Sequence, residues 1–253
     1  MKVVSFNVNG IRAAARRGVV DFLRMSGDII CLQEIKANAE QAMEVLRSLE
    51  SEFHVFVNPA QKAGYSGTAL VTRSQPISVR FDFGFLGDEG RVIIAEYAEF
   101  YVVNCYVPHG GKRLDVKMEF LDVLWKTVAS LDKPVIVAGD MNIAHTEKDL
   151  SHPKICHNTT GFLPEERKVL DGVVGSGFVD TFRVMNPDVQ AYTWDSYRSK
   201  TGRKGWNYRF DYIFVDGRLR DRIASADILY EHFYSDHYPI ELALSSRLSL
   251  LER

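Results

Sequence analysis

The chain has 253 residues, of which 46% are hydrophobic and 25% are charged, and 31 Lys and Arg residues against 33 Asp and Glu residues give a formal net charge of −2. These proportions are typical of an ordinary globular protein, and a charge so close to zero argues against a histone-like polycation. The three cysteines are an odd number, which argues against a disulfide-rich secreted scaffold.

The sequence contains no pattern typical of a targeting or membrane segment. The N-terminal stretch MKVVSFNVNG turns polar too early for a signal peptide, and no apolar run approaches the ~18 residues of a membrane span. Neither a linker nor a repeat divides the chain. We therefore expect an intracellular, cytoplasmic protein without membrane attachment, folded as one domain over residues 1–253 with a C-terminal tail from about residue 246.

Short segments rich in Val, Ile, Phe and Tyr recur along the chain, and their length and composition predict strands. They lie at residues 3–8, 28–33, 54–59, 68–73, 77–83, 92–97, 100–107, 134–140, 209–215 and 240–245.

Four helices fit between these strands. The first is expected over residues 11–25, with Gly18 as a candidate break, and the second over residues 38–50, opened by a capping-box pattern. Apolar spacing predicts a third around residues 121–128, and a proline-first, glycine-last pattern predicts a fourth over residues 164–175. Many strands and few helices favour paired sheets flanked by helices over a doubly wound parallel sheet.

Polar residues end or interrupt several of the predicted strands, where carboxylates are costly unless they are paired or bind a cation. They are Asn7, Asn9, Glu34, Asp140, Asn142, Asp211, Asp236 and His237. Hard oxygen ligands without clustered Cys or His favour Mg²⁺ or Mn²⁺ over zinc. The pattern therefore indicates metal-assisted phosphoryl transfer to water.

Each of these residues has a structural explanation when it is taken alone. Asp140 in a Gly-Asp turn would be a turn former roughly three times in four. Asp236 and His237 could form a cap or a surface pair, and Asp211 could accept backbone hydrogen bonds. The chemical interpretation depends on the combination of residues and on their order along the chain.

Eleven short motifs, spread over nearly the whole chain, carry a more specific signal. In order they are SFNVNGIR (5–12), LQEIK (32–36), GYSG (64–67), EGRVI (89–93), YVPHGG (106–111), GDMN (139–142), GFLPEER (161–167), DTFR (180–183), YTW (192–194), RFDY (209–212) and SDHYPI (235–240). Together they resemble the exonuclease III and apurinic/apyrimidinic (AP) endonuclease group of the endonuclease/exonuclease/phosphatase superfamily. The segments LQE.K, GYSG, YVP and GF.P.ER are specific to its DNA-repair branch.

The resemblance implies an α/β (α+β) fold that is a four-layered sandwich, with two mixed β-sheets packed face to face and helices on the outer faces. It implies a Mg²⁺-dependent enzyme, with Mn²⁺ as a substitute, that cleaves DNA 5′ to abasic sites and leaves a 3′-hydroxyl. It also allows 3′-to-5′ exonuclease and 3′-end-cleaning activity. The expected partner is double-stranded DNA with abasic sites or blocked 3′ ends, bound by a monomer.

The resemblance also implies roles for the strand-end residues. Glu34 corresponds to the principal metal ligand, and the residues around the metal are Asn7, Asn9, Asp236, Asp140, Asn142 and His237. Asp140 matches the residue that aligns or deprotonates the attacking water, and Asn142 helps to hold the phosphate. His237, oriented by Asp211, would donate to a phosphate oxygen, and Tyr106 would contact the scissile phosphate.

Residues outside this centre would bind the substrate. Trp194 matches one aromatic wall of a pocket for the flipped-out abasic sugar, and either Trp206 or Tyr208 would form the other. The residues expected to contact DNA phosphates are Arg12, Lys36, His109, Lys112, Arg113, Asn158, Arg183, Arg198, Lys200, Arg203 and Lys204. Any one of these basic residues, taken alone, is more often a solvated surface charge.

The chain departs from its mammalian relatives at several positions. Asn9 replaces an Asp, which removes one negative charge from the metal site. His109 and Lys112 replace an amide and an arginine, and Cys156 stands where a phosphate-binding Asn is expected, with Asn158 as a substitute. The long basic N-terminal extension with a nuclear signal is missing, which suggests a prokaryotic-type protein.

Two other functions are compatible with these patterns. One is a metal-dependent phosphodiesterase of the same superfamily that acts on RNA, a phosphoinositide or a sphingolipid. The other is a catalytically inactive DNA-binding module on the same scaffold, which the intact set of strand-end residues disfavours.

Overall fold

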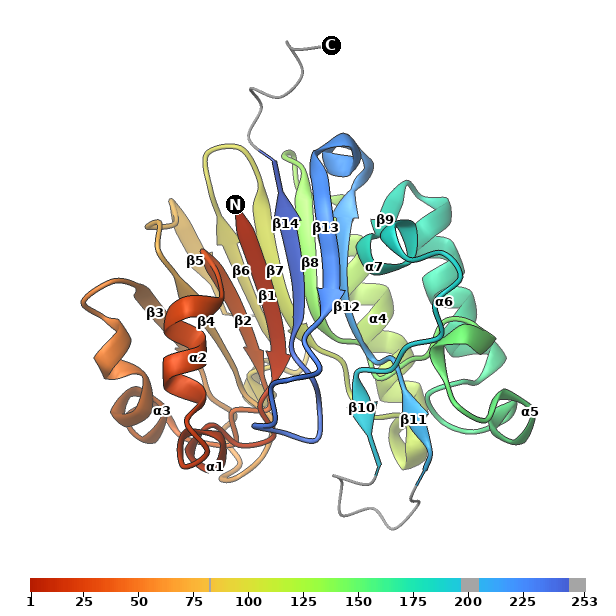
Figure 1. Ribbon diagram of the computed structural model, residues 1–253, viewed down its shortest axis with the longest axis horizontal. Coiled ribbons are helices and arrows are strands. Elements are labelled where there is room, and N and C mark those ends of the chain that lie inside the picture. The colour runs from red at the N-terminus through yellow and green to blue at the C-terminus, as the bar shows by residue number, and fades with distance from the viewer. Residues whose placement is uncertain (82, 197–204, 246–253) are drawn as a thin grey trace.

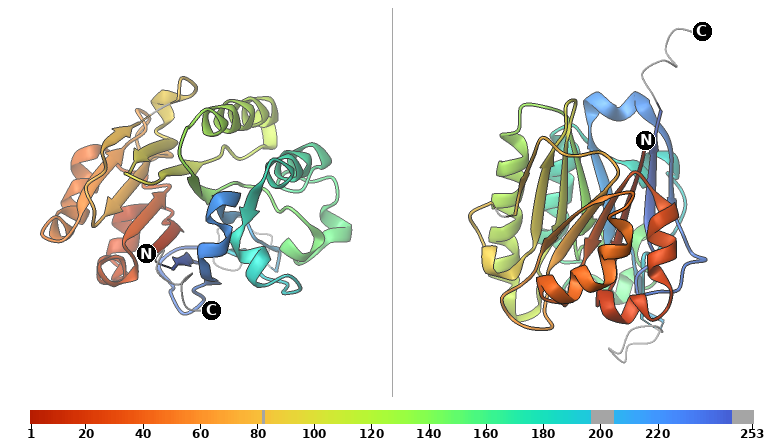
Figure 2. Two further views of the ribbon diagram at one scale, coloured as in Figure 1. Left: turned by 90° about the horizontal axis from the view of Figure 1, so that it is seen from above. Right: turned by 90° about the vertical axis from the view of Figure 1, so that its left-hand side faces the viewer.

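Two six-stranded mixed sheets pack face to face in the computed structural model, which describes residues 1–81, 83–196 and 205–245 (Figure 1). Helices cover the outer face of each sheet, so the molecule has four layers (Figure 2). This arrangement confirms the predicted fold class. Among the described residues, no helix has the length and apolar character to cross a membrane.

The first sheet has the strand order β13-β14-β1-β2-β4-β3. Only β1 and β2 are parallel, and the other neighbours are antiparallel. Its strands are β1 (Lys2–Asn7), β2 (Ile29–Gln33), β3 (His54–Asn58), β4 (Thr68–Thr72), β13 (Ile223–Ile228) and β14 (Ile240–Leu244).

The second sheet has the order β5-β6-β7-β8-β12-β9, and here β7 and β8 are the parallel pair. Its strands are β5 (Ser78–Arg80), β6 (Val92–Glu96), β7 (Tyr101–Tyr106), β8 (Val135–Asp140), β9 (Phe178–Asp180) and β12 (Asp211–Asp216). A separate two-stranded hairpin consists of β10 (Trp194–Asp195) and β11 (Asn207–Tyr208).

Seven α-helices lie among the described residues. They are α1 (Ile11–Ala15), α2 (Val19–Ser26), α3 (Ala39–Leu46), α4 (Leu114–Ala129), α5 (Pro153–Cys156), α6 (Pro164–Gly175) and α7 (Thr181–Met185). The break at Gly18 is confirmed, since this glycine has a left-handed backbone (φ 87°) between α1 and α2. The capping box of Asn38 with Gln41 is also confirmed, and α3 passes into a 3₁₀ turn over Arg47–Leu49.

Three apolar clusters hold the layers together. The central one joins the facing sides of the two sheets, with Val3 and Leu70 from one sheet and Ile136 and Ile213 from the other. A second cluster packs α1, α2 and α3 on the outer face of the first sheet, and a third packs α4 and α6 on the second. Burying both faces of the central strands explains why their sequences are almost continuously apolar.

The predicted strands are present, but several boundaries and elements differ. The segment 77–83 forms a strand only over Ser78–Arg80. The strands β9, β10, β11 and β13 and the helices α5 and α7 were not predicted. β13 is an edge strand in which only Ala226 is fully buried, so its sequence IASADI lacks an apolar pattern. The other missed elements span two to five residues and carry little periodicity.

The topology brings several strand ends to one edge of the sandwich. β1, β2, β7 and β8 all run toward this edge, while β12 and β14 start from it because they are antiparallel to β8 and β1. The edge lies at the bottom of Figure 1, next to the β10–β11 hairpin and opposite the N-terminus. The polar residues at the strand ends therefore meet there.

Candidate active site

A cleft of about 600 Å³ opens at this edge between the two sheets. Most of the strand-end residues line it, together with an aromatic wall. The lining residues are Asn9, Glu34, Lys36, Tyr106, His109, Gly111, Asp140, Asn142, Thr159, Thr160, Trp194, Trp206, Tyr208, Phe210, Asp236 and His237. Asn7 and Asp211 are buried directly beneath this lining.

Asn7 connects carboxylates from the two sheets. Its Nδ2 donates to Glu34 Oε1 at 3.0 Å and to Asp140 Oδ2 at 2.9 Å. Glu34 follows β2 of the first sheet, whereas Asp140 ends β8 of the second. Asn7 therefore fixes the spacing of two acidic groups that would otherwise repel each other.

Four lining residues other than glycine have left-handed backbones in the turns that follow strands. They are Asn9 (φ 43°), Glu34 (φ 52°), Lys36 (φ 48°) and Asn142 (φ 52°). A non-glycine residue in this region costs free energy, most clearly for a residue such as Glu34, and such strain concentrates at functional sites. The turn after β2 is supported from outside, because Ile35 N and Lys36 N donate to the backbone of the GYSG segment.

Gly139 and Gly67 are required by close packing at the same edge. A Cβ atom on Gly139 would lie 1.8 Å from the carbonyl oxygen of Cys105 on the neighbouring strand. A Cβ atom on Gly67 would lie 2.7 Å from the side chain of Ile35, and the φ of Gly67 is 82°. These contacts explain why glycines precede Asp140 and close the GYSG motif.

His237 is held between two aspartates. Its Nδ1 lies 2.8 Å from Asp211 Oδ2, and its Nε2 lies 3.9 Å from Asp140 Oδ2. Asp211 is paired in register with Asp140 across β12 and β8. The side chain of His237 is 6% exposed, so its neighbours rather than water decide its protonation.

Burial and charge shift the pKa values of these groups in opposite directions. Burial lowers the pKa of His237, but the charge of Asp211 and its hydrogen bond outweigh burial and raise this pKa overall. Burial, reinforced by the charge of Asp211, raises the pKa of Asp140. The result is a protonated donor and a carboxyl group that readily takes up a proton, side by side.

Tyr106 ends β7 and faces the same centre. Its Oη donates to Glu34 Oε1 at 2.7 Å. Burial, followed by the charges of Glu34 and Asp140, raises the pKa of Tyr106 well above its ordinary value. The phenol is therefore protonated and can act as a hydrogen-bond donor.

A second group of polar contacts lies beside Glu34. Lys36 Nζ lies 2.5 Å from Glu34 Oε2 and donates to Asn9 Oδ1 at 2.5 Å. Asn9 Nδ2 donates to Asp236 Oδ1 at 2.8 Å, and Trp194 Nε1 donates to Asp236 Oδ2 at 3.2 Å. The pKa of Glu34 is lowered because Lys36, with help from Asn7, outweighs the raising effect of burial.

The chemistry of these side chains fits a hard divalent cation. One ligand atom each from Glu34, Asp140 and His237 lies within 4.8 Å of the others. The buried Oδ1 of Asp211 has no hydrogen-bond partner among the described residues, so the negative charge here exceeds what the protein itself pairs. Carboxylate and amide oxygens dominate the set, as Mg²⁺ and Mn²⁺ prefer.

Four aromatic side chains form one wall of the cleft. Tyr208 and Phe210 stack with ring centroids 4.7 Å apart, and Trp194 packs obliquely on both. Trp206 also lines the cleft, so the wall uses both of the residues between which the sequence left a choice. Cys156 lies behind the wall, with its Sγ 3.1 Å from Tyr208 Oη.

The residues predicted to contact DNA phosphates lie at different places in the structure. Lys36 and His109 line the cleft, while Arg12, Lys112 and Asn158 are exposed and do not line it. Arg113 is engaged with Glu89 and Tyr65. Arg198, Lys200, Arg203 and Lys204 lie outside the described residues.

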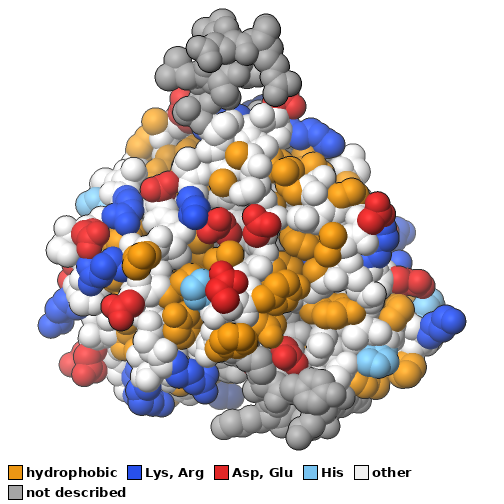
Figure 3. All heavy atoms as spheres, viewed as in Figure 1, with side chains coloured by type: hydrophobic (Ala, Val, Ile, Leu, Met, Phe, Trp, Pro, Cys, Tyr) orange, Lys and Arg blue, Asp and Glu red, His pale blue; other side chains and the backbone are white. Residues whose placement is uncertain are grey.

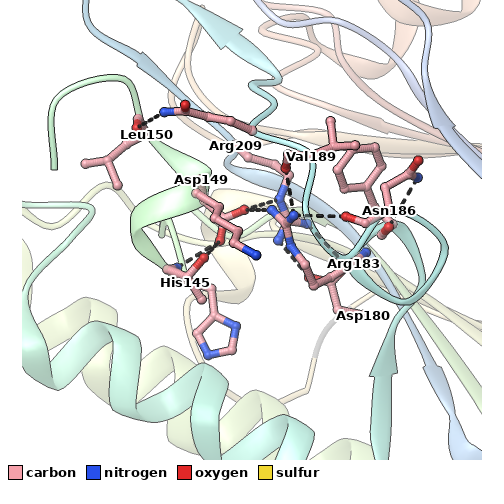
Figure 4. Close-up of polar contacts among 12 residues, drawn as sticks. His145, Asp149, Leu150, Asp180, Arg183, Asn186, Val189 and Arg209 are labelled. Atoms are coloured by element: carbon pink, nitrogen blue, oxygen red, sulfur yellow. Dashed lines mark hydrogen bonds and ion pairs between the residues drawn. The ribbon is translucent and has the colours of Figure 1, made fainter.

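Arg183 is not brought to the cleft. Its NH2 donates to Asp149 Oδ1 at 2.6 Å, and its NH1 donates to the carbonyl oxygens of Asn186 and Val189. Figure 4 shows that Arg209 points at Asp149 as well, and Arg209 also pairs with Asp180. These contacts favour a structural role for Arg183, because its NH1 and NH2 groups donate inside the protein.

Three lining side chains were missed by the sequence analysis. Phe210 lies inside the RFDY motif, where an aromatic residue at a strand start gave a usable signal. Thr159 and Thr160 come from an irregular segment after α5, and nothing in their sequence context marks them.

Comparison with known proteins agrees with this geometry. Residues 4–237 match the family model described as "Endonuclease/Exonuclease/phosphatase family". The chain is 39% identical to an exodeoxyribonuclease of Bacillus subtilis (strain 168), with 97% of this chain and 100% of that protein covered. It is 35% identical to the DNA repair nuclease APEX1 of Danio rerio, with 97% and 82% covered.

A solved structure shows the same arrangement. The fold superimposes on an AP endonuclease from Archaeoglobus fulgidus with a TM-score of 0.86 at 27% identity, and the match covers 97% of this chain and 100% of that one. Together these matches confirm the resemblance that the motifs predicted.

Proposed function

Because the chain belongs to the endonuclease/exonuclease/phosphatase family, we propose that it is a Mg²⁺-dependent DNA-repair phosphodiesterase. It cleaves the DNA backbone 5′ to abasic sites and leaves a 3′-hydroxyl. The relatives named exodeoxyribonuclease and DNA repair nuclease support this reaction class. The proposal also includes 3′-to-5′ exonuclease and 3′-end-cleaning activity.

One observation carries the proposal. Carboxylate oxygens of Glu34 and Asp140 and a ring nitrogen of His237 converge within 4.8 Å in a cleft whose other wall is aromatic. This combination supports hydrolysis of a phosphate beside a surface that could hold an extrahelical sugar or base.

The cation would be held chiefly by Glu34, with Asp236, Asn7 and Asn9 close by. When bound, Mg²⁺ or Mn²⁺ supplies Lewis-acid stabilisation of charge on the phosphate. Asn9 is neutral, so the carboxylate charge beside Glu34 comes from Asp236 and Asp140.

The protein groups divide the remaining work. Asp140 aligns the attacking water and accepts its proton, as its raised pKa favours. His237, kept protonated by Asp211, donates to a phosphate oxygen. The hydroxyl of Tyr106, which donates to Glu34 in the free protein, would turn its single hydrogen to the scissile phosphate, and Asn142, which lines the cleft, holds a second phosphate oxygen.

Asn142 is itself held in place by the protein. Its Nδ2 donates to the carbonyl oxygen of Val107 at 2.9 Å, and its backbone N–H donates to Asp140 Oδ1 at 2.8 Å. The buried Lys117 donates to its carbonyl oxygen at 2.8 Å and pairs with Glu166. The GFLPEER motif therefore supports the site through Glu166.

Substrate choice depends on the aromatic wall and on local charge. Trp194, Trp206 and Tyr208 would enclose the abasic sugar, and Lys36, His109, Lys112, Arg12 and Asn158 would contact DNA phosphates. On the face shown in Figure 3, basic and acidic side chains are interspersed, so we expect local phosphate contacts rather than a broad basic field.

The proposal includes a monomer that acts inside the cell. Sedimentation of the purified protein with and without abasic duplex tests this part, and a dimer in both conditions would contradict it.

The main test uses matched DNA substrates. A duplex with one tetrahydrofuran abasic analogue should be cut in Mg²⁺ much faster than the undamaged duplex, and EDTA should stop the cutting. Preferential hydrolysis of RNA, a phosphoinositide or sphingomyelin would favour the alternative phosphodiesterase. Binding of abasic DNA without cutting would favour the inactive binding module.

A further inference from the structure

A partly buried cluster of charged and aromatic side chains lies beside Tyr106, with Arg91 as its buried member. It is built mainly by the GYSG and EGRVI motifs, to which the proposed chemistry gives no task, and its members are Tyr65, Glu89, Arg91 and Arg113. We propose that Arg91 is a positioning residue for Tyr106. This inference rests on the proposed function, in which the hydroxyl of Tyr106 acts at the scissile phosphate.

Two hydrogen bonds to backbone carbonyl oxygens link Arg91 and Tyr106. Tyr106 N donates to the carbonyl oxygen of Arg91 at 2.8 Å, and Arg91 NH1 donates to the carbonyl oxygen of Tyr106 at 3.0 Å. Gly90, directly before Arg91, packs against the backbone of Asn58, since it has φ 60° and a Cβ atom there would lie 2.4 Å from the carbonyl oxygen of Asn58. The Arg91 side chain of the EGR sequence therefore lies at the end of β7.

The guanidinium group of Arg91 also packs over the phenol ring of Tyr106. Its Cζ lies 4.7 Å from the ring centroid, where a cation is attracted to the negative face of the ring. The hydroxyl group of the same side chain donates from Oη to Glu34 Oε1. Contacts with the ring face and with the hydroxyl together restrict the ring to one orientation.

Arg91 is itself held rigidly. Its Nε donates to Glu89 Oε2 at 2.6 Å, and its NH2 donates to Tyr65 Oη at 2.9 Å. With NH1 on the Tyr106 carbonyl, all three guanidinium nitrogens are engaged. A planar fork with fixed donors suits this arrangement, and a lysine could not reproduce it.

Arg113 closes the cluster from the other side. Its NH2 donates to Glu89 Oε1 at 2.8 Å, and its NH1 donates to Tyr65 Oη at 2.9 Å. Arg91 is 3% exposed and is not among the residues that line the cleft. Any effect of Arg91 on the substrate is therefore expected to act through Tyr106.

A double-mutant cycle tests this inference. Arg91→Lys and Arg91→Met, each made in the parent and in Tyr106→Phe, are compared for kcat and KM on abasic duplex. In the parent we expect kcat to fall about tenfold or more with KM within about twofold, and in Tyr106→Phe we expect a further loss below about twofold. Arg73→Met is the control, because Arg73 also packs over a ring, that of Phe53, and donates to a backbone carbonyl far from the cleft.

Several results would overturn the inference. An equal loss in both backgrounds would make Arg91 a general structural residue, and a raised KM with unchanged kcat would make it a substrate contact. Arg91→Lys keeps a cation beside Glu89, so the cycle remains measurable if Arg91→Met does not fold. An inactive parent protein would instead count against the proposed function.

A spectroscopic readout does not depend on activity. With 3-fluorotyrosine placed at position 106, the ¹⁹F NMR signal should shift and broaden in Arg91→Met and Arg91→Lys, because the ring gains freedom to reorient. The signal should be unchanged in Arg73→Met. An unchanged signal in folded Arg91 variants would contradict positioning, whatever the activity.

Discussion

The Nδ1 atom of His237 lies 2.8 Å from Asp211 Oδ2, while the other oxygen of Asp211 is buried with no partner among the described residues. The charge of Asp211 is therefore paired with the imidazole of His237. The pairing fixes which ring nitrogen faces Asp140 and keeps the imidazole protonated at neutral pH.

Replacing this carboxylate while keeping its shape should therefore disable the histidine. For Asp211→Asn we expect kcat to fall by roughly 10²- to 10⁴-fold with little change in DNA affinity. The raised pKa of His237 should also drop, so activity on the alkaline side should be lost at a lower pH than in the parent. Rate profiles between pH 6 and pH 10 measure both effects.

The control for this variant is Asp216→Asn, at the far end of the same strand, where the carboxylate pairs with Arg218. Its rate should match the parent. A parent-like pH profile in Asp211→Asn would contradict the role assigned to the pair.

Removal of the cation should abolish activity without unfolding the protein. Lys36 and Asn7 already contact Glu34, so the carboxylate of Glu34 stays paired when the cation is removed. Adding Mg²⁺ or Mn²⁺ to the chelated protein should restore cutting and raise the melting temperature. In Glu34→Gln this thermal shift should be lost, whereas Glu96→Gln, a carboxylate paired with Lys133, should keep it. A full shift in Glu34→Gln would place the cation elsewhere.

The aromatic wall should control which DNA is cut. Trp206→Ala removes one wall residue and should raise KM for the abasic duplex by about tenfold, since apolar contact with the sugar contributes about 25 cal/mol per Å², and ~60 Å² of such contact corresponds to a tenfold effect. Trp194→Phe keeps a ring but loses the bond to Asp236, so it should lower kcat more than it raises KM. Steady-state kinetics on abasic and undamaged duplexes separate the two effects, and equal discrimination in all three proteins would contradict this role.

The buried carboxylate of Asp149 should dominate acid stability. Its pKa is lowered because the charges of Arg209 and Arg183, together with hydrogen bonds from Arg209, outweigh the raising effect of burial. Asp149→Asn should reduce the free energy of unfolding by about 3–5 kcal/mol at neutral pH.

The sign of the pH effect follows from the lowered pKa. The carboxylate stabilises the fold above its unfolded pKa of ~3.9, and this contribution is lost as the pH falls from there toward the folded value. The difference between parent and Asp149→Asn should therefore shrink below about pH 4. Asp188→Asn, an exposed partner of Lys148, should melt like the parent at every pH. A difference that stays constant to pH 2 would contradict this assignment.

The site residues and their order along the chain could be predicted from the sequence, because these residues lie at the ends of strands. Asn7, Glu34 and Asp140 each follow an apolar run, and burial of that run forces the next polar residue to the sheet edge. The sequence could not show that Asn7 bridges the two sheets, because that contact joins residues 133 positions apart.

Arg183 illustrates what the sequence leaves undetermined. A basic residue in a motif suits a phosphate contact and a buried ion pair equally well, and the difference lies in Asp149, 34 positions earlier. Similarly, β13 has no apolar alternation because it is an edge strand, so only its pairing with β14 reveals it.

The most direct test of the account is the chemistry of the cut ends on a duplex with one tetrahydrofuran site. Mg²⁺-dependent incision is expected immediately 5′ to that site, giving a 3′-hydroxyl that a DNA polymerase extends without further treatment, and Asp140→Asn should be inactive although folded. Incision 3′ to the site, a 3′-phosphate at the cut, or no incision at all would contradict it.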